Sequence, residues 1–320
     1  MTPVAPADQP EPRRGGGPIG VVVMAYGTPS SPDQIEAYYT HIRRGRPPSE
    51  EQLANLRMRY EALGGTSTLA ARTADQVRVI AEALEELAPG RFIVTLGQKH
   101  AAPFVEDGVA SLVTAGATEV VGVVLAPHYS AFSVGQYLER AGDAAREAGV
   151  AFRGVERWWD LQEYRWFLAD AVEEELARLT PQTIVAFTAH SLPERVLVGD
   201  PYPDELVAAA QSVMDVAKVP PLGGWITAWQ SAGATPEPWR GPDILEVIRE
   251  LGESGEREGI LVCPHGFVSD HLEVAYDLDI EAEKLAHEVG LDFRRTRVLN
   301  DDPKVLGALA RRIAEVALAD

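Results

Sequence analysis

The sequence predicts an α/β fold made of two similar units, each a parallel sheet flanked by helices. Short apolar runs of strand length alternate with amphipathic stretches of helical length along the chain, and the same strand-end motifs occur in both halves. Strands that are apolar throughout and separated by helices are typical of parallel sheets covered on both faces. The predicted strands cover residues 19–25, 92–97, 119–125, 151–155, 183–188, 224–229, 259–263 and 292–298.

Two long helices are predicted between the first two strands. In "SEEQLANLRMRYEALGG", Ser49 is placed to cap a helix with Gln52 three residues later, and Gly64 is placed just past its end. In "LAARTADQVRVIAEALEEL", apolar residues recur with a period of 3.6 residues and predict one buried face. That face contains Val77, Ile80, Ala81 and Leu84.

The two halves repeat three motifs in the same order. The first half contains "VVVMAYGTP", "VTLGQKHAAP" and "VVLAPHYS", and the second contains "TIVAFTAHSLP", "ITAWQSAGATP" and "ILVCPHGF". This order predicts a duplicated α/β unit with a boundary near residues 160–180. Parallel sheets bind ligands beyond the carboxyl ends of their strands, so the side chains at those ends are expected to face one cleft. They are Tyr26, Gln98, Tyr129, His190, Gln230 and His265.

Composition excludes several classes of protein. The 320 residues carry a formal charge of −19, which argues against a nucleic-acid partner. The single cysteine, Cys263, excludes an internal disulfide framework and a Cys-ligated iron–sulfur cluster. No apolar run approaches the roughly 20 residues of a membrane span. Residues 1–18 are rich in Pro and Gly and predict a disordered tail, so we expect a soluble, cytoplasmic protein without integral membrane association.

His190 and an acidic segment are the first candidates for chemistry. A histidine at a strand end is as consistent with a helix cap or a loop contact as with a ligand site. In "GFVSDHLEVAYDLDIEAEKLAHEVG", Asp270 is expected to cap a helix on which three carboxylates recur every four residues: Glu273, Asp277 and Glu281. A capping-box glutamate and a solvated acidic face would explain this pattern. The alternative is a carboxylate track for a divalent cation, which with an imidazole would suit ferrous iron without selecting it strongly.

A basic cluster stands out in this acidic chain. Five arginines fall within seventeen residues: Arg43, Arg44, Arg46, Arg57 and Arg59. An ordinary surface with i,i+4 partners is one interpretation, but "HIRRGRPP" contains no acid. The guanidinium group binds carboxylates bidentately, so the cluster favours a ligand that carries carboxylates.

Several of these motifs together resemble one known family. They are "VMAYGTP", "YYTHIRRG", "LRMRYEALGGTSTLA", "LAPHYSAFSV", "AHSLPE", "WQSAGATPEPWRGPDI" and "GFVSDHLEV". They are similar to motifs of ferrochelatases, which insert ferrous iron into a porphyrin, and the similarity runs from about residue 19 to the end. The resemblance implies two Rossmann-like, chelatase-type domains at 19–165 and 166–320 with the active site in the cleft between them. The last helix is expected to pack back on the first domain.

The resemblance also implies roles for individual residues. His190 and Glu273 would be catalytic and bind the metal, with Asp277 and Glu281 as a possible metal track. The porphyrin and its propionates would be contacted by Tyr26, Arg43, Arg59, Tyr60, Ser67 and Tyr129. Tyr26 resembles the tyrosine of the Gram-positive type, which acts on coproporphyrin III and in which this residue ligates the product iron from the opposite face.

The implied function is therefore a lyase-class enzyme of haem biosynthesis that inserts Fe²⁺ into coproporphyrin III to give Fe-coproporphyrin III. A protoporphyrin IX ferrochelatase and a non-catalytic haem or porphyrin carrier are the alternatives. A carrier would keep Tyr26 and the arginines but would not need the acidic track. The resemblance implies no cofactor beyond the Fe²⁺ substrate, a monomer, and a transient hand-over to a coprohaem decarboxylase. His265 is expected to make a loop contact rather than to be a second imidazole at the site.

Overall fold

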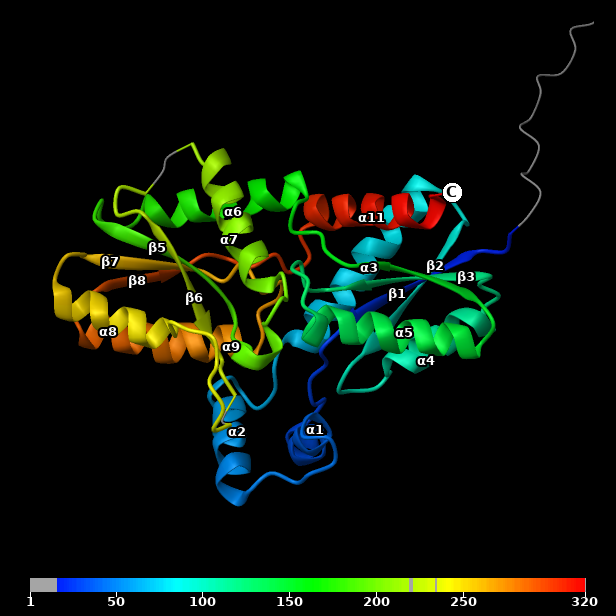
Figure 1. Cartoon of the computed structure of the whole chain (residues 1–320), viewed down its shortest axis with the longest axis horizontal. Helices are drawn as coiled ribbons and strands as arrows, with labels where there is room; N and C mark the ends of the chain where they lie inside the picture. Colours follow the sequence, from blue (N-terminus) through cyan, green and yellow to red (C-terminus); the bar gives the residue numbers. More distant parts are fainter. Residues whose placement is uncertain (1–15, 219–220, 234, 320) are drawn as a thin grey trace, which may run out of the picture.

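Two four-stranded parallel sheets lie side by side (Figure 1). The computed structural model describes residues 16–218, 221–233 and 235–319. The predicted tail therefore lies outside the described residues except for 16–18. Among the described residues, no helix combines the length and the apolar character needed to cross a membrane.

The two sheets have the same strand order. The first contains β1 (Ile19–Ala25), β2 (Phe92–Gln98), β3 (Glu119–Val124) and β4 (Ala151–Val155) in the order β2-β1-β3-β4. The second contains β5 (Thr183–His190), β6 (Trp225–Gln230), β7 (Gly259–Cys263) and β8 (Asp292–Arg295) in the order β6-β5-β7-β8. All eight predicted strands are confirmed, although the last ends three residues earlier than expected. The identical order confirms the α/β fold of two similar units.

Alternate residues of each central strand face opposite layers of helices, because successive side chains of a strand point to opposite sides. Val21 and Val23 of β1 pack with α3 (Leu69–Leu87) and α11 (Pro303–Leu318). Val22 and Met24 pack with α4 (Val105–Thr114) and α5 (Gln136–Glu147). In the second sheet, α6 (Gln162–Leu176) and α7 (Tyr202–Val216) lie on one side, and α8 (Ile244–Ser254) lies on the other. Burial on both faces explains why these strands are apolar throughout.

The largest apolar cluster is continuous from one sheet to the other. It contains Val21 of β1 and Phe187 of β5, with Trp158 and Tyr164 between them. The last helix, α11, packs against α3 of the first sheet (Figure 1). The predicted domain limits at 165 and 166 stay a prediction.

A lobe of two helices projects from the junction of the sheets (Figure 1). It contains α1 (Ile35–Ile42) and α2 (Glu50–Ala62), preceded by the 3-10 turn η1 (Pro32–Gln34). The predicted capping box of Ser49 and Gln52 is confirmed, and Gly64 follows the end of α2 with φ +92. Leu53 and Tyr60 of α2 pack against Leu272 and Tyr276 from the second half of the chain. The lobe therefore brings Arg59 close to the acidic segment.

The acidic segment is not the regular α-helix that was expected. It forms α9 (Leu272–Ala275), a π-helix η4 (Asp277–Ala282) and α10 (Glu283–Glu288). The predicted cap at Asp270 is wrong. The side chain of Asp270 is occupied by Arg295 and Asn300, so His271 is the N-cap and its Nδ1 accepts the Glu273 N–H. Short π-helical segments are rare and occur frequently at functional sites. The other short helices are the π-helix η2 (Ala131–Gly135) and the 3-10 helix η3 (Glu194–Val196).

Candidate active site

His190 is the last residue of β5, at the carboxyl end of the second sheet. Its Nδ1–H donates to the Ser191 carbonyl at 2.5 Å, which leaves Nε2 free to face Glu273. The Nε2 and Oε1 atoms of this pair are 3.4 Å apart, and about a third of each side chain is exposed. The Ser191 carbonyl therefore orients the imidazole, and Nε2 and the Glu273 carboxylate face each other in a partly exposed position that a ligand can reach.

The pair shifts the protonation of both groups. Burial alone would lower the pKa of His190, but the negative charge of Glu273 and a hydrogen bond to it raise that pKa to about 9. Burial would raise the pKa of Glu273, but His190, with His271 and Arg59 adding to its effect, lowers that pKa to about 2. At neutral pH the pair therefore consists of an imidazolium and a carboxylate, and the imidazole must lose a proton before it can bind a metal ion.

Gln230 fixes the relative position of His190 and Glu273. It is fully buried at the end of β6, in register with His190. Its Nε2–H donates to the Glu273 carbonyl at 2.8 Å, and its Oε1 accepts from the Thr188 hydroxyl at 2.8 Å. Gln230 was recognised only as a strand-end residue in the sequence, because the partner of a buried amide cannot be inferred from local spacing.

Tyr26 approaches from the first sheet. It follows β1 directly, one residue beyond Ala25, which pairs with Gln98 as His190 pairs with Gln230 in the second sheet. Gly27 has φ +91, and a Cβ there would lie 2.9 Å from that of Ala101, so the close turn after Tyr26 requires glycine. Burial raises the pKa of Tyr26, and the charge of Glu273 is the next largest cause of that rise. The Glu273 charge therefore acts on the Tyr26 hydroxyl.

Arg59 and Asp277, which were expected to serve different ligands, form an ion pair between Nη2 and Oδ1. The other Asp277 oxygen accepts from the Ser231 hydroxyl at 2.5 Å. Burial and the nearby Glu273 charge raise the pKa of Asp277 to about 6, against the opposing effect of Arg59. Ser231, with φ +61, was missed in the sequence because nothing in its neighbourhood signals a side-chain role.

Tyr60 and Arg43 lie in the lobe. Tyr60 is buried, and its hydroxyl is 3.4 Å from that of Thr28, near Tyr26. Arg43 ends α1, and its guanidinium lies over the Tyr39 ring, with no carboxylate partner among the described residues. This guanidinium is available to an anionic ligand.

Ser67 and Tyr129 make their contacts outside the pair of His190 and Glu273. The Ser67 hydroxyl accepts the Leu69 N–H at 3.1 Å at the start of α3. The Tyr129 N–H donates to Glu205 Oε2 at 2.8 Å, and its ring lies under the Arg157 guanidinium. The contacts of Tyr129 come from the domain junction rather than from His190 or Glu273.

Glu281 and His265 are not part of the pair formed by His190 and Glu273. Glu281 is exposed, and its charge contributes only weakly to the raised pKa of Asp277. His265 is fully buried, with Nε2 3.2 Å from the Leu206 carbonyl and its ring 5.1 Å from that of His128. His265 therefore contacts the carbonyl of a residue of α7 and the His128 ring, where a loop contact was expected.

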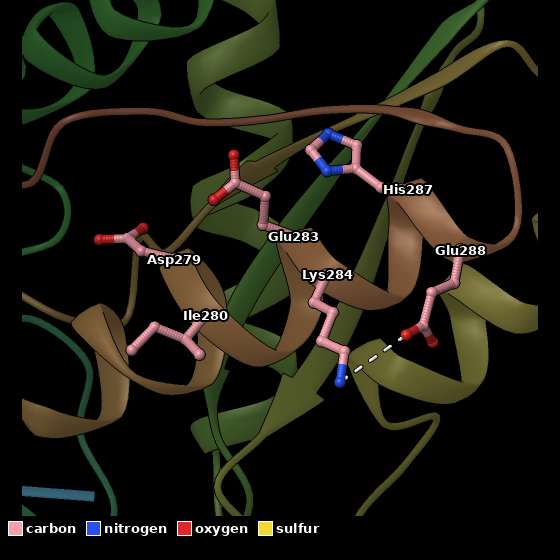
Figure 2. A pocket seen from close by; sticks show the side chains of 6 residues that line it. All are labelled: Asp279, Ile280, Glu283, Lys284, His287 and Glu288. Carbon is pink, nitrogen blue, oxygen red and sulfur yellow. Dashed lines mark ion pairs between the residues drawn. The ribbon is translucent and has the colours of Figure 1, made fainter. Parts of the chain in front are cut away.

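A separate depression lies on the surface of η4 and α10 (Figure 2). It is lined by Asp279, Ile280, Glu283, Lys284, His287 and Glu288. Asp279 is already bound by Arg295 through two hydrogen bonds of 2.6 and 2.7 Å, and Lys284 pairs with Glu288. None of the predicted site residues lines this depression. Among the described residues, no three His, Cys, Asp or Glu side chains are grouped so that they could hold a metal ion.

The sequence as a whole matches one family. The family model described as ferrochelatase matches residues 18–317. A protein of Anoxybacillus flavithermus named coproporphyrin III ferrochelatase is 45% identical over 299 residues, covering 91% of this chain and 94% of that protein. Proteins of the same name from Halalkalibacterium halodurans and Bacillus subtilis are 42% and 41% identical, covering 91% of this chain and 95% and 96% of their own lengths.

Solved structures of other chelatases share the fold. SirB from Bacillus subtilis, solved with Fe³⁺, superposes with a TM-score of 0.57 at 15% identity, covering 94% of this chain and 96% of that one. CbiX, described as the terminal enzyme of sirohaem biosynthesis in denitrifying bacteria, gives 0.52 at 12% identity, with coverage of 94% and 100%. At these identities the likeness concerns the two-domain Rossmann-like fold alone.

Proposed function

The chain belongs to the ferrochelatase family, and from this premise we propose that it inserts Fe²⁺ into coproporphyrin III to give Fe-coproporphyrin III in haem biosynthesis. The observation that carries the proposal is the pair of His190 and Glu273 at the carboxyl end of β5. An imidazole and a carboxylate are suitable donors for ferrous iron. The relatives at 40–45% identity that carry the name coproporphyrin III ferrochelatase support the choice of substrate.

His190 and Glu273 would manage both charge and protons. Insertion exchanges two pyrrole N–H protons for one Fe²⁺, so two protons must leave the centre of the macrocycle. Glu273, ionised across the physiological range, offsets the charge of the metal. His190, whose side chain is about a third exposed, first gives up its own proton to the solvent, because only the neutral imidazole can bind iron or accept a pyrrole proton. The approach of a dication favours the loss of this proton, because the positive charges of the metal and the imidazolium repel each other.

The lobe and the first sheet would hold the porphyrin. A tetracarboxylate substrate needs several cations at the rim of the cleft, and Arg43 and Arg59 are the proposed partners of its propionates. The remaining proposed porphyrin contacts are Tyr60, Ser67 and Tyr129. Tyr26 would lie against the opposite face of the macrocycle from His190 and ligate the product iron. Binding energy from the rim would hold the macrocycle in a ruckled shape that admits the metal.

The proposal also covers the enzyme class, the cellular location, the oligomeric state and the partners of the protein. We place the enzyme in the lyase class, in the cytoplasm and as a monomer, with a transient hand-over of product to a coprohaem decarboxylase. It would need no cofactor beyond its Fe²⁺ substrate. The single cysteine, Cys263, lies buried in β7 and cannot by itself hold an iron–sulfur cluster.

The substrate is tested by absorbance under anaerobic conditions. Fe²⁺ is supplied with either coproporphyrin III or protoporphyrin IX, and the four-band spectrum of the free base is followed. Collapse of that spectrum with coproporphyrin III, at a kcat/KM well above that for protoporphyrin IX, is the expected result. A preference for protoporphyrin IX would identify the alternative enzyme, and binding without conversion of either would identify a carrier.

A further inference from the structure

The ion pair between Arg59 and Asp277 joins the lobe to the acidic segment. Arg59 lies on α2 and Asp277 begins η4, and their side chains are 23% and 10% exposed. Both Asp277 oxygens are occupied, one by Arg59 and the other by the Ser231 hydroxyl. The Arg59 guanidinium lies 4.8 Å from the centre of the Tyr276 ring, and its Nε–H is buried without a hydrogen-bond partner among the described residues. Asp277 is therefore fully engaged, while Arg59 keeps an unused donor.

In the proposed reaction, Arg59 and Asp277 each bind a substrate as well as each other. Arg59 is a proposed partner of a substrate propionate. Asp277 follows Glu273 by four residues, and the adjacent residues Gln230 and Ser231 bind the Glu273 carbonyl and the Asp277 carboxylate, so Asp277 lies beside the pair without being grouped with it in the paired state. While Arg59 is paired with Asp277, the guanidinium neutralises this carboxylate and repels a dication. The propionate and the Fe²⁺ therefore compete with the ion pair between Arg59 and Asp277.

We propose that Arg59 couples the two substrates: a propionate of the bound porphyrin takes over the guanidinium, and Asp277 is released to join His190 and Glu273 around the Fe²⁺. This inference rests on the proposed function. A buried carboxylate or guanidinium that loses its partner is costly, so neither group separates without a replacement. The propionate replaces Asp277 as the partner of Arg59, and the metal replaces Arg59 as the partner of Asp277. Because coupling between two sites is reciprocal, bound metal also strengthens porphyrin binding.

The metal side of the coupling is tested without porphyrin. Co²⁺, which has the same charge and similar ligand preferences to Fe²⁺, is titrated calorimetrically into the substrate-free protein. Arg59→Met is expected to bind Co²⁺ at least roughly fivefold more tightly than the unmodified protein, the lower end of typical coupling between sites. The double variant Arg59→Met/Asp277→Asn is expected to lose that gain. Arg57→Met is the matched control, since Arg57 lies on the same helix but pairs with Glu36.

The porphyrin side uses a variant that keeps Arg59. Asp277→Asn frees the guanidinium and is expected to tighten binding of coproporphyrin III by roughly fivefold or more in a fluorescence titration. Equal Co²⁺ affinity in Arg59→Met and the unmodified protein would overturn the inference. So would an equal gain in Arg59→Met and the double variant, or no tightening of coproporphyrin III by Asp277→Asn. Iron insertion by the unmodified protein is measured separately, so failure of the proposed function is distinguished from failure of the coupling.

Discussion

The Nε2 atom of His190 lies 3.4 Å from Oε1 of Glu273, although the two residues come from a strand end and a short helix far apart in the chain. The pair is held by backbone contacts on both sides: the Ser191 carbonyl binds the imidazole, and Gln230 binds the Glu273 carbonyl. The imidazole ring and the backbone that carries Glu273 are therefore positioned without a substrate, as a metal-insertion site requires.

The first prediction concerns the pH dependence of iron insertion. The pKa of His190 is raised to about 9, so the imidazole is protonated at neutral pH and kcat/KM for Fe²⁺ is expected to rise as pH increases toward that value. In Glu273→Gln the largest cause of the raised pKa is removed, and the pKa of His190 should fall. The remaining pH profile of that variant is expected to shift to lower pH, which a series of insertion assays across pH will measure. An unchanged midpoint in the variant would contradict this assignment.

The same pair makes folding stability depend on pH. A raised pKa for His190 means that its contribution is complete below about pH 6.5 and is lost as pH rises through about 9. A lowered pKa for Glu273 means that its contribution is present above about pH 4.5 and is lost as pH falls through about 2. Both contributions are therefore complete between about pH 4.5 and 6.5. Urea unfolding of Glu273→Gln across pH is expected to show a smaller loss of stability between pH 6.5 and 9 than the unmodified protein.

Glu205 is predicted to hold Tyr129 in place across the junction of the two sheets. Its carboxylate accepts the Tyr129 N–H at 2.8 Å and pairs with Arg157 at 2.8 Å. Glu205→Ala leaves that N–H without its partner, so we expect a loss of about 1–3 kcal/mol in the free energy of unfolding and weaker binding of coproporphyrin III. Glu205→Gln keeps an acceptor and should recover most of both in denaturation and fluorescence titrations. If Glu205→Gln is as damaging as Glu205→Ala, the ion pair with Arg157 rather than the Tyr129 contact is decisive.

A buried histidine pair is predicted to make the protein sensitive to acid. His128 and His265 follow β3 and β7, the matching strands of the two sheets, and their rings are 5.1 Å apart. Burial holds the pKa of His128 well below its usual value and lowers that of His265 to about 4. Below about pH 6.5 the unfolded chain therefore binds more protons than the folded one, and stability falls as pH drops toward 4.

Denaturation at several pH values checks this effect. His128→Leu is expected to flatten the decline between pH 6.5 and 4. His287→Ala provides the control, because His287 is exposed on α10 and should leave the slope unchanged. An equal slope in His128→Leu and the unmodified protein would show that other groups cause the acid sensitivity.

Much of the fold could be predicted because it depends on local patterns. Apolar runs separated by helices identified all eight strands, and Ser49 with Gln52 identified the start of α2. The repeated strand-end motifs also followed from sequence order, although Tyr26 lies one residue beyond the register position of His190. These features need only the period and the end signals of each element.

The arrangement of the site was less predictable, because it depends on contacts between distant residues. Arg59 and Asp277 are 218 residues apart in the chain, and no spacing rule connects them. The assignment of Asp270 as a helix cap failed for the same reason, since Arg295 and Asn300 occupy its carboxylate from elsewhere in the fold. The π-helix at Asp277–Ala282 likewise changes which side chains share a face, which a regular four-residue spacing does not anticipate.

The most direct test of the central claim compares the unmodified protein with His190→Ala in two assays. Fluorescence titration measures binding of coproporphyrin III, and anaerobic absorbance measures its conversion by Fe²⁺. Because His190 is assigned to the metal rather than to the rim of the porphyrin, the variant is expected to bind coproporphyrin III with nearly unchanged affinity and to lose insertion. Insertion by His190→Ala at a rate near that of the unmodified protein would contradict the account.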